Sequence, residues 1–442
     1  MPITCAHAHS HSCLAPSREH AAVADQAASI DAPRQPQAYA RLFPELPALE
    51  VEEDLLYALG RQGGACDGAP FADEGTDDAS GAAGWPFFGQ FVAHDITADR
   101  SGLVHHADVA ALRNARRQKI NLEFLYGAGP AGDPYLFDIN DPAKLLLGCN
   151  DAGRPDDLQR NAQGTAIIGD PRNDSHVVMA QLHLVFCRFH NAVVDHLRGH
   201  GVPSADLFEE ARRMVRWHYQ WIVLHDFLPR LVGPDLAEQL LSGGARDYRP
   251  GDDPYVPLEF ADAAYRYGHA QIRHSYRLNA TMSPVPIFPD LLGFRPVPAA
   301  HVIDWATLFD VPGRPPAQRA KKIDGRLCAA LIDLPAAITG EVTVDVHRSL
   351  AARDLQRGLA VSLPSGEAVA RRLGITPLSP REIGLAAYGW QGETPLWYYV
   401  LKEAEACTDG DRLGAVGGRI VGEVLVGLMD HDPGSFRAAP AG

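Results

Sequence analysis

Residues 84–97 read GWPFFGQFVAHDIT, and this short apolar stretch organises the rest of the chain. The stretch is predicted to be a helix, since Pro86 is tolerated in a first helical turn. Gln90 and His94 are four residues apart, so they share one face of that helix. An amide and an imidazole aimed together into apolar surroundings need a ligand or each other. For His94 taken alone, a core histidine bonded to a carbonyl remains the alternative.

The composition indicates a globular protein with a large core. The chain has 442 residues, is 46% hydrophobic and carries a formal net charge of -15 at pH 7, which disfavours a nucleic-acid partner. No apolar run approaches the ~20 residues of a membrane span, and the N-terminus does not resemble a signal peptide. The seven cysteines include no CxxC pair, which argues against a disulfide framework. We therefore expect no transmembrane segment and a reducing, cytoplasmic location.

The hydrophobic pattern predicts a mainly helical domain with long loops and few short strands. Residues 1–35 lack periodicity and are predicted to be a flexible N-terminal arm, and residues 36–442 a single large domain. Asn173 or Asp174 is expected to cap the first long helix, and residues 342–344 carry the clearest strand signal. The helices expected after the opening one lie near 174–198, 204–228, 258–274, 346–360, 365–373, 394–406 and 413–429.

Two later segments carry polar residues of the kind that a ligand pocket uses. The Gly/Pro loop IGDPRND, residues 168–174, leads into the first long helix and presents Arg172 at its start. The segment YRYGH, residues 265–269, places His269 among aromatic residues in the expected third helix. For each residue alone, a structural role remains open: Arg172 as a helix brace and His269 as a buried histidine.

Taken in order, these segments resemble the animal-type haem peroxidases of the peroxidase–cyclooxygenase superfamily. The resemblance is carried by GQFVAHDIT (89–97), GDPRNDSHVVMAQLHLVFCRFHNAVV (169–194) and YRYGHAQI (265–272). Later segments, among them LAARDLQRG (350–358) and TPLWYYVLKEAE (394–405), are similar to those of its bacterial members. The resemblance covers about residues 80–430 and implies the helical haem peroxidase fold.

The resemblance implies an enzyme that uses hydrogen peroxide to oxidise a small organic or (pseudo)halide substrate through an oxoferryl intermediate. At the matching positions, His94 is the distal acid–base histidine, and Gln90 is its companion. Arg172 is the distal arginine, which stabilises the negative charge that grows as the O–O bond breaks. The implied partners are hydrogen peroxide and a small-molecule reductant, and the oligomeric state is left open.

The resemblance also assigns residues to the other side of the haem. His269 matches the axial ligand of the iron, and Arg357 matches an arginine that pairs with a haem propionate. Asp354 stands where the family has an asparagine that accepts the other N–H of the axial imidazole. A carboxylate there is expected to make the imidazole more anionic and to lower the iron reduction potential. Arg266 replaces the radical tyrosine of cyclooxygenases, three residues before His269, and is expected instead to reach a propionate.

The two carboxylates through which animal peroxidases often bond their haem are missing from this chain. Their positions hold Ala93, directly before His94, and Ser175, three residues after Arg172. Neither residue can form the ester, so the expected cofactor is non-covalent haem b that acid organic solvent extracts. The neighbouring His176 is expected to bring a second imidazole near the haem edge, and its role is open.

A calcium site is also implied by the resemblance. It would use Asp95, which follows the distal histidine, and the loop RQKINLEFLYG, residues 117–127. Asn121 and Glu123 are oxygen ligands at alternating positions, suited to a hard cation. Arg117 stands in place of a threonine ligand. An ion pair between Asp95 and a basic side chain of this loop is therefore the metal-free alternative.

Two other functions remain open at this point. One is a haem-dependent oxygenase or dioxygenase acting on a lipid or a secondary metabolite. Replacement of the radical tyrosine by Arg266 disfavours its fatty-acid version. The other is an inactive haem-binding scaffold, which Ser175 and His176 keep open.

Overall fold

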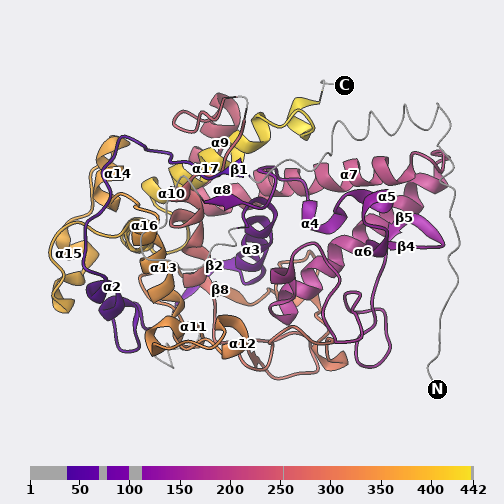
Figure 1. Cartoon of the computed structure of the whole chain (residues 1–442), viewed down its shortest axis with the longest axis horizontal. Helices are drawn as coiled ribbons and strands as arrows, with labels where there is room; N and C mark the ends of the chain where they lie inside the picture. The colour runs from indigo at the N-terminus through magenta and orange to yellow at the C-terminus, as the bar shows by residue number, and fades with distance from the viewer. Residues whose placement is uncertain (1–36, 69–76, 99–111, 252, 440–442) are drawn as a thin grey trace, which may run out of the picture. The chain divides into compact units, whose positions relative to one another are not determined.

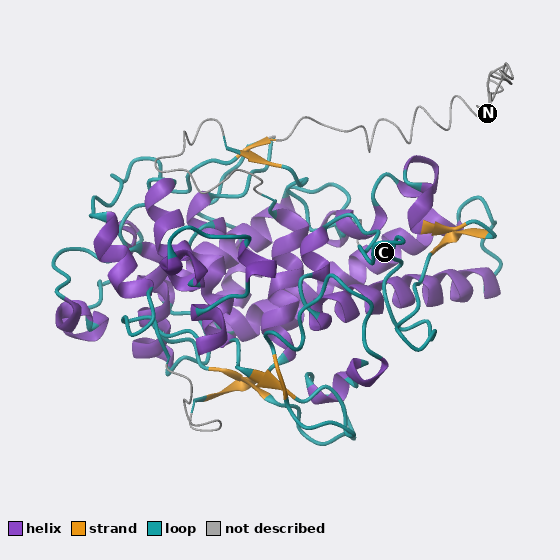
Figure 2. Ribbon diagram, turned by 60° about the horizontal axis from the view of Figure 1, so that its bottom comes forward, coloured by secondary structure: helices purple, strands orange, loops and turns teal. Residues whose placement is uncertain are grey.

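The computed structural model describes residues 37–68, 77–98, 112–251 and 253–439. The predicted arm, residues 1–35, lies outside this range. Residues Pro36–Gly442 form one unit. Within its described part, helices occupy the interior and short two-stranded sheets lie at the margins (Figure 1 and Figure 2). The predicted mainly helical fold class is confirmed.

The helices follow one another with loops of varied length. In chain order the α-helices of the described residues are α2 (Glu53–Gly60), α3 (Gly84–Ile96), α4 (Glu123–Tyr126), α5 (Gly129–Gly132), α6 (Val177–Gly199), α7 (Leu207–Ile222), α8 (Leu228–Val232), α9 (Pro234–Gly243), α10 (Leu258–Ala261), α11 (Ala329–Ile332), α12 (Ala336–Thr339), α13 (Leu350–Ala360), α14 (Gly366–Arg372), α15 (Pro380–Ile383), α16 (Leu396–Thr408) and α17 (Ala415–Asp430).

The strands of the described residues pair antiparallel, two at a time. The pairs are β1 (Gln37–Ala38) with β3 (Arg113–Asn114), β2 (Asp78–Ala82) with β8 (Arg319–Lys321), β4 (Phe137–Asp138) with β5 (Asp141–Leu145), and β6 (Ser275–Tyr276) with β7 (Val285–Pro286).

The predicted opening helix is α3, which lies deep among the other helices (Figure 1). Phe91 is fully buried. Its ring stacks on Phe186 of α6 at 4.7 Å between centroids and meets the edge of Phe124 at 4.7 Å. Buried aromatic pairs of this kind add about 0.5–1.5 kcal/mol each beyond the area they bury. This packing holds the helix that carries Gln90 and His94.

The long helix α6 carries the apolar stripe that its periodicity predicts. Among the described residues it is the one helix long and apolar enough to cross a membrane, but 72% of its apolar window is buried within the domain. Its start differs from the prediction, because residues Pro171–Asp174 form a separate 3₁₀ turn, η3. The N-cap is therefore His176, whose side chain accepts the N–H of Met179, and not Asn173 or Asp174.

Residues 258–274 were predicted as one α-helix, and this prediction is wrong for most of the segment. Only α10 is α-helical there. The chain leaves the helical path at Ala263 (φ -140°, ψ -82°) and continues as a 3₁₀ helix, η5 (Ala264–Gln271). A 3₁₀ helix has three residues per turn, so side chains three apart eclipse each other. Arg266 and His269 therefore lie on one side of η5.

Two further predictions need correction. The helix expected over 204–228 continues beyond its predicted end, because α7 passes through a π-helical turn, Val223–Phe227, into α8. Pro229 is tolerated there because it lies in the first turn of α8. Residues 342–344 form no strand, and Val344 is 49% exposed. Without a neighbouring strand, the three β-branched residues of this segment gain no ladder hydrogen bonds.

Replacing Phe91 by alanine should destabilise the domain. The cavity left among the aromatic rings is expected to cost about 3–5 kcal/mol in the free energy of unfolding, measured by chemical denaturation. Leu55→Ala is the control, since Leu55 is 39% exposed and its loss should cost less than about 0.5 kcal/mol. Equal losses in the two variants would contradict the central position of α3.

Candidate functional site

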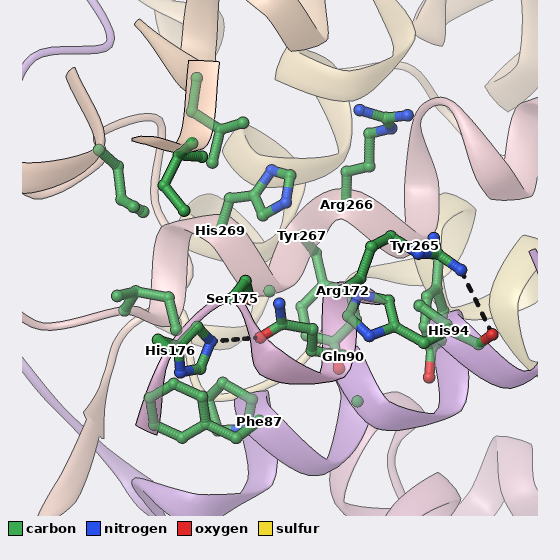
Figure 3. Close-up of a pocket in the computed structure, with 18 of the residues that line it drawn as sticks. Phe87, Gln90, His94, Arg172, Ser175, His176, Tyr265, Arg266, Tyr267 and His269 are labelled. Carbon is green, nitrogen blue, oxygen red and sulfur yellow. Dashed lines mark hydrogen bonds between the residues drawn. The ribbon is translucent and has the colours of Figure 1, made fainter. Parts of the chain in front are cut away.

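A cavity of about 340 Å³ opens between α3, the η3–α6 junction and η5 (Figure 3). The predicted residues Gln90, His94, Arg172, Arg266 and His269 all line it. His269 comes from one side of the cavity and His94 from the other, as Figure 3 shows. Two imidazoles that are far apart in the chain therefore face one enclosed space.

His94 is held in one tautomer by Asn173. The Nδ1 atom of His94 lies 2.7 Å from the Asn173 side-chain oxygen, which can only accept, so Nδ1 carries the proton. The Asn173 amide nitrogen in turn donates to Nδ1 of His183 at 3.1 Å. Burial, aided by the charge of Arg172, lowers the pKa of His94 to about 3. His94 is therefore neutral, with an unprotonated Nε2 available to act as a base.

Sequence reasoning missed Asn173 and His183. Asn173 was assigned only as a possible helix cap, and His183 was assigned no role. Both residues are buried, with 0% and 2% of their surface exposed. The signal available was their position: Asn173 directly follows Arg172, and His183 lies two turns along the helix that this loop begins.

Arg172 is anchored beside His94 by a carboxylate and by backbone carbonyls. Its Nε and Nη2 atoms donate to Asp170 at 3.0 and 2.7 Å, and Nη2 also donates to the carbonyl oxygens of Thr97 and His94. Burial alone would raise the pKa of Asp170, but Arg172 and Arg116 hold it well below its usual range. The guanidinium is thus fixed at the edge of the cavity.

His176 orients Gln90. Because Nδ1 of His176 accepts the N–H of Met179, the proton is on Nε2, which donates to the Gln90 side-chain oxygen at 3.1 Å (Figure 3). The amide nitrogen of Gln90, a donor only, is left for other partners. Burial lowers the pKa of His176 to about 3, so this imidazole is neutral. The role that the sequence left open for His176 is therefore one of positioning in this structure.

On the other side of the cavity, His269 is fixed through Asp354 of α13. Nδ1 of His269 donates to Asp354 Oδ2 at 2.6 Å, so in the neutral ring the bare nitrogen is Nε2. Asp354 is fully buried. Burial pushes the pKa of Asp354 upward, but His269 and Arg266 outweigh it and keep the pKa below its usual range. An imidazole with its Nε2 lone pair exposed to the cavity is a ready metal ligand.

The two remaining arginines bind carboxylates of the protein. Arg266, expected at a propionate, instead donates to Asp354 Oδ1 at 2.8 Å and to Asp262 Oδ1 at 2.9 Å. Arg357 lies one turn after Asp354 on α13, and its Nε donates to Asp262 Oδ1 at 3.0 Å. The contacts Arg266–Asp354 and Arg357–Asp262 join residues 88 and 95 positions apart, which a local sequence pattern does not report. The contact between Arg266 and Asp262 is local, four residues apart, and was overlooked at the level of the sequence.

Comparison with known proteins agrees with this arrangement. The profile of the animal haem peroxidase family matches residues 110–375. The chain belongs to the animal haem peroxidase family. Thyroid peroxidase of Canis lupus familiaris is 31% identical over 240 residues, which are 48% of this chain and 25% of that protein. Thyroid peroxidase of Mus musculus is 25% identical over 377 residues, 76% of this chain and 40% of that protein. The chain therefore covers well under half the length of these relatives.

Solved structures share the fold of this haem peroxidase family member. Peroxidase A from Dictyostelium discoideum superposes with a TM-score of 0.68 at 14% identity, covering 91% of this chain and 88% of that one. Fatty acid alpha-dioxygenase from Arabidopsis thaliana gives 0.59 at 15% identity, covering 90% and 73%. At these identities the likeness shows the fold alone.

The residues that line the cavity fit a haem group. His269 offers its Nε2 to the cavity. A Cβ added to the neighbouring Gly268 would meet no atom within 4 Å, so the space beside His269 is open. Ala93 and Ser175 also line the cavity, and neither carries a carboxylate. The apolar walls come mainly from Ile272, Leu331, Leu334, Ile338 and Leu350.

The residues predicted to bind calcium do not fit a cation. The buried carboxylate of Asp95 accepts the backbone N–H groups of Asn121, Leu122 and Glu123 at 2.9–3.0 Å. Glu123 accepts the backbone N–H of Arg117, and the Asn121 side-chain oxygen accepts the N–H of Glu123. In the described part of the chain, no three His, Cys, Asp or Glu side chains gather to hold a metal ion.

In this structure neither basic side chain of the loop is the partner of Asp95. Lys119, one of the two basic side chains of the loop, extends to Asp432 at 2.7 Å. The other, Arg117, lies 3.6 Å from Glu123. The link from Asp95 is thus made to peptide N–H groups. The Asp95 carboxylate already accepts three N–H groups, and a cation would have to compete with these donors for the same oxygens.

Calcium should leave the stability of the domain unchanged. Adding calcium or a chelator is expected not to shift the thermal midpoint, whereas a ligand at about 100 times its Kd would add about 2.7 kcal/mol. Asp95→Ala should lower the midpoint, because each buried N–H left without an acceptor costs about 1–3 kcal/mol. Differential scanning calorimetry measures both effects. A midpoint that rises with calcium concentration would show that the ion binds after all.

Proposed function

We propose that this chain is a haem peroxidase that uses hydrogen peroxide to oxidise a small organic or (pseudo)halide substrate. One observation carries the proposal: His94 and His269 face a single cavity, each with its Nδ1 bound elsewhere. Both imidazoles therefore offer Nε2 to whatever occupies the space between them. Membership of the animal haem peroxidase family supports the same conclusion.

The cofactor that we propose is haem b, held without a covalent bond. When bound, the haem supplies the redox chemistry, and the protein orients and tunes it. His269 would hold the iron through Nε2. Ala93 and Ser175 offer no carboxylate for an ester, so coordination and packing hold the group.

On the other side, the chain's own residues handle the proton. His94 Nε2 would take a proton from the peroxide oxygen nearer the haem and return it to the farther oxygen, so that the farther oxygen could leave as water. The two electrons that this cleavage consumes would come from the bound haem. Arg172, fixed beside His94, stabilises the negative charge that builds on the departing oxygen. The Gln90 amide nitrogen adds a hydrogen-bond donor to the same space. Asn173 keeps the proton on Nδ1 of His94, so that Nε2 is free at the start of each cycle.

The observations favour the peroxidase over the two alternatives. A fatty-acid oxygenase that uses a tyrosine three residues before His269 would need that residue where Arg266 binds Asp354 and Asp262. The likeness to fatty acid alpha-dioxygenase lies in the fold. An inactive scaffold has no use for an anchored base and guanidinium, and this chain retains both His94 and Arg172.

Stopped-flow spectroscopy of the haem-loaded protein with hydrogen peroxide tests the proposal. His94→Ala should keep the haem absorption and slow the peroxide step by at least the ~10²-fold that general acid–base catalysis provides. His269→Ala should lose or alter haem binding, because it removes the ligand. His218→Ala is the matched control, since this imidazole is exposed on α7 and should change neither property.

Two results, one with peroxide and one without it, separate the alternatives. A wild-type haem band that does not respond to peroxide would identify an inactive scaffold. Oxygen consumption with an organic substrate and no peroxide would identify an oxygenase.

The pH dependence of the peroxide step should depend on residue 173. Because burial and Arg172 lower the pKa of His94 to about 3, the base is unprotonated above that pH, and the rate constant should stay flat down to mildly acidic pH. In Asn173→Asp, a carboxylate accepting the Nδ1 proton favours the imidazolium and raises the pKa of His94. The rate should then fall at a higher pH than in the wild type.

Asn173→Ala is the control for this experiment. It removes the acceptor without adding charge, so it should lower the rate without moving the fall to higher pH. Superimposable pH profiles for the wild type and Asn173→Asp would rule out Asn173 as the partner of the base.

A further inference from the structure

The carboxylate of Asp354 has a different partner on each of its two oxygens. Oδ2 accepts from Nδ1 of His269 at 2.6 Å, and Oδ1 accepts from Nη1 of Arg266 at 2.8 Å. Asp354 itself is fully buried in α13. Both donors come from η5, where the 3₁₀ geometry eclipses side chains three residues apart. A cation and the imidazole thus share one carboxylate.

A second carboxylate holds Arg266 in this position. Asp262 accepts from Nη2 of Arg266 at 2.9 Å and from Nε of Arg357 at 3.0 Å. The Nε of Arg266 donates to the carbonyl oxygen of Ala261 at 3.0 Å. Two carboxylates and two guanidiniums alternate, so the buried charges compensate one another. Figure 3 shows the Arg266 side chain on the same side of η5 as His269, pointing away from His94.

The physical consequence concerns the electron density on His269. A carboxylate that accepts the Nδ1 proton makes the imidazole a stronger donor at Nε2. A guanidinium on the opposite oxygen attracts the same negative charge, and this makes the carboxylate a weaker acceptor for the imidazole proton. With Asp354 paired to Arg266, His269 should therefore be a stronger donor at Nε2 than it would be beside a neutral amide. It should be a weaker donor than it would be beside a free carboxylate.

We propose that Arg266 is a positioning residue that acts through Asp354 to limit how strongly His269 donates to a bound haem iron. The proposal rests on the proposed function in taking haem as the ligand of His269. It corrects the expectation that a carboxylate at position 354 simply lowers the iron reduction potential. It also gives Arg266 a role other than contact with a propionate.

A double-mutant cycle on the haem-loaded protein tests this. The readouts are the iron–histidine stretching band of the ferrous protein by resonance Raman spectroscopy and the ferric/ferrous midpoint potential by spectroelectrochemical titration. Arg266→Leu should move the band to higher frequency and the potential to a more negative value. Asp354→Asn should move both in the opposite direction. In the Asp354→Asn background, Arg266→Leu should cause almost no further shift.

A conservative variant covers the case in which Arg266→Leu fails to fold. Arg266→Lys keeps the charge but loses the planar fork that reaches two carboxylates, so it should produce shifts of the same sign and smaller size. A pure packing role for Arg266 would move neither the band nor the potential in the lysine variant.

Two results would overturn the inference. One is an absence of any shift on changing Arg266 in the wild-type background. The other is a shift of the same size in both backgrounds, which would mean that Arg266 acts without Asp354. A wild-type protein that binds haem without any iron–histidine band would instead refute the proposed function itself. The two failures are thus distinguishable.

Discussion

The site depends on one constraint: His94 and His269 each need a hydrogen-bond acceptor for the Nδ1 proton. A histidine with a bound Nδ1–H presents a bare Nε2 in one direction, whereas an unbound ring could take either tautomer and turn. Asn173 meets this need for His94, and Asp354 meets it for His269. The acceptors differ in charge. The neutral amide keeps the base neutral, and the carboxylate strengthens the ligand.

The fold brings each imidazole to its acceptor through a short 3₁₀ segment at one wall of the cavity. The segment η3 brings Arg172 and Asn173 to α3, and η5 brings His269 to α13. Both segments lie between or beside longer α-helices that are packed into the core (Figure 1). A 3₁₀ turn suits such a site, because side chains three residues apart in the sequence lie along one line.

Much of this arrangement followed from the sequence, and the rest could not. The helix at 84–97 and the grouping of His94, Arg172 and His269 were accessible, because apolar periodicity and motif order are local properties. Asn173 was interpreted as a cap, since its true partner is 79 residues away and periodicity does not report such a distance. The contact of Arg266 with Asp354 was missed for the same reason, since the two residues are 88 positions apart. A 3₁₀ helix and an α-helix also share the i, i+3 pattern, so η5 was predicted as α.

The anchor of Asp95 has a consequence for how the domain is assembled. Its carboxylate gathers three peptide N–H groups of the loop that follows α3 in the chain, so the wall that carries His94 is completed by the polypeptide alone. The helix and the loop therefore do not reach their final places independently, because the peptide groups of residues 121–123 need the Asp95 carboxylate. The same contact sets His94, one residue earlier on α3, in its place at the cavity.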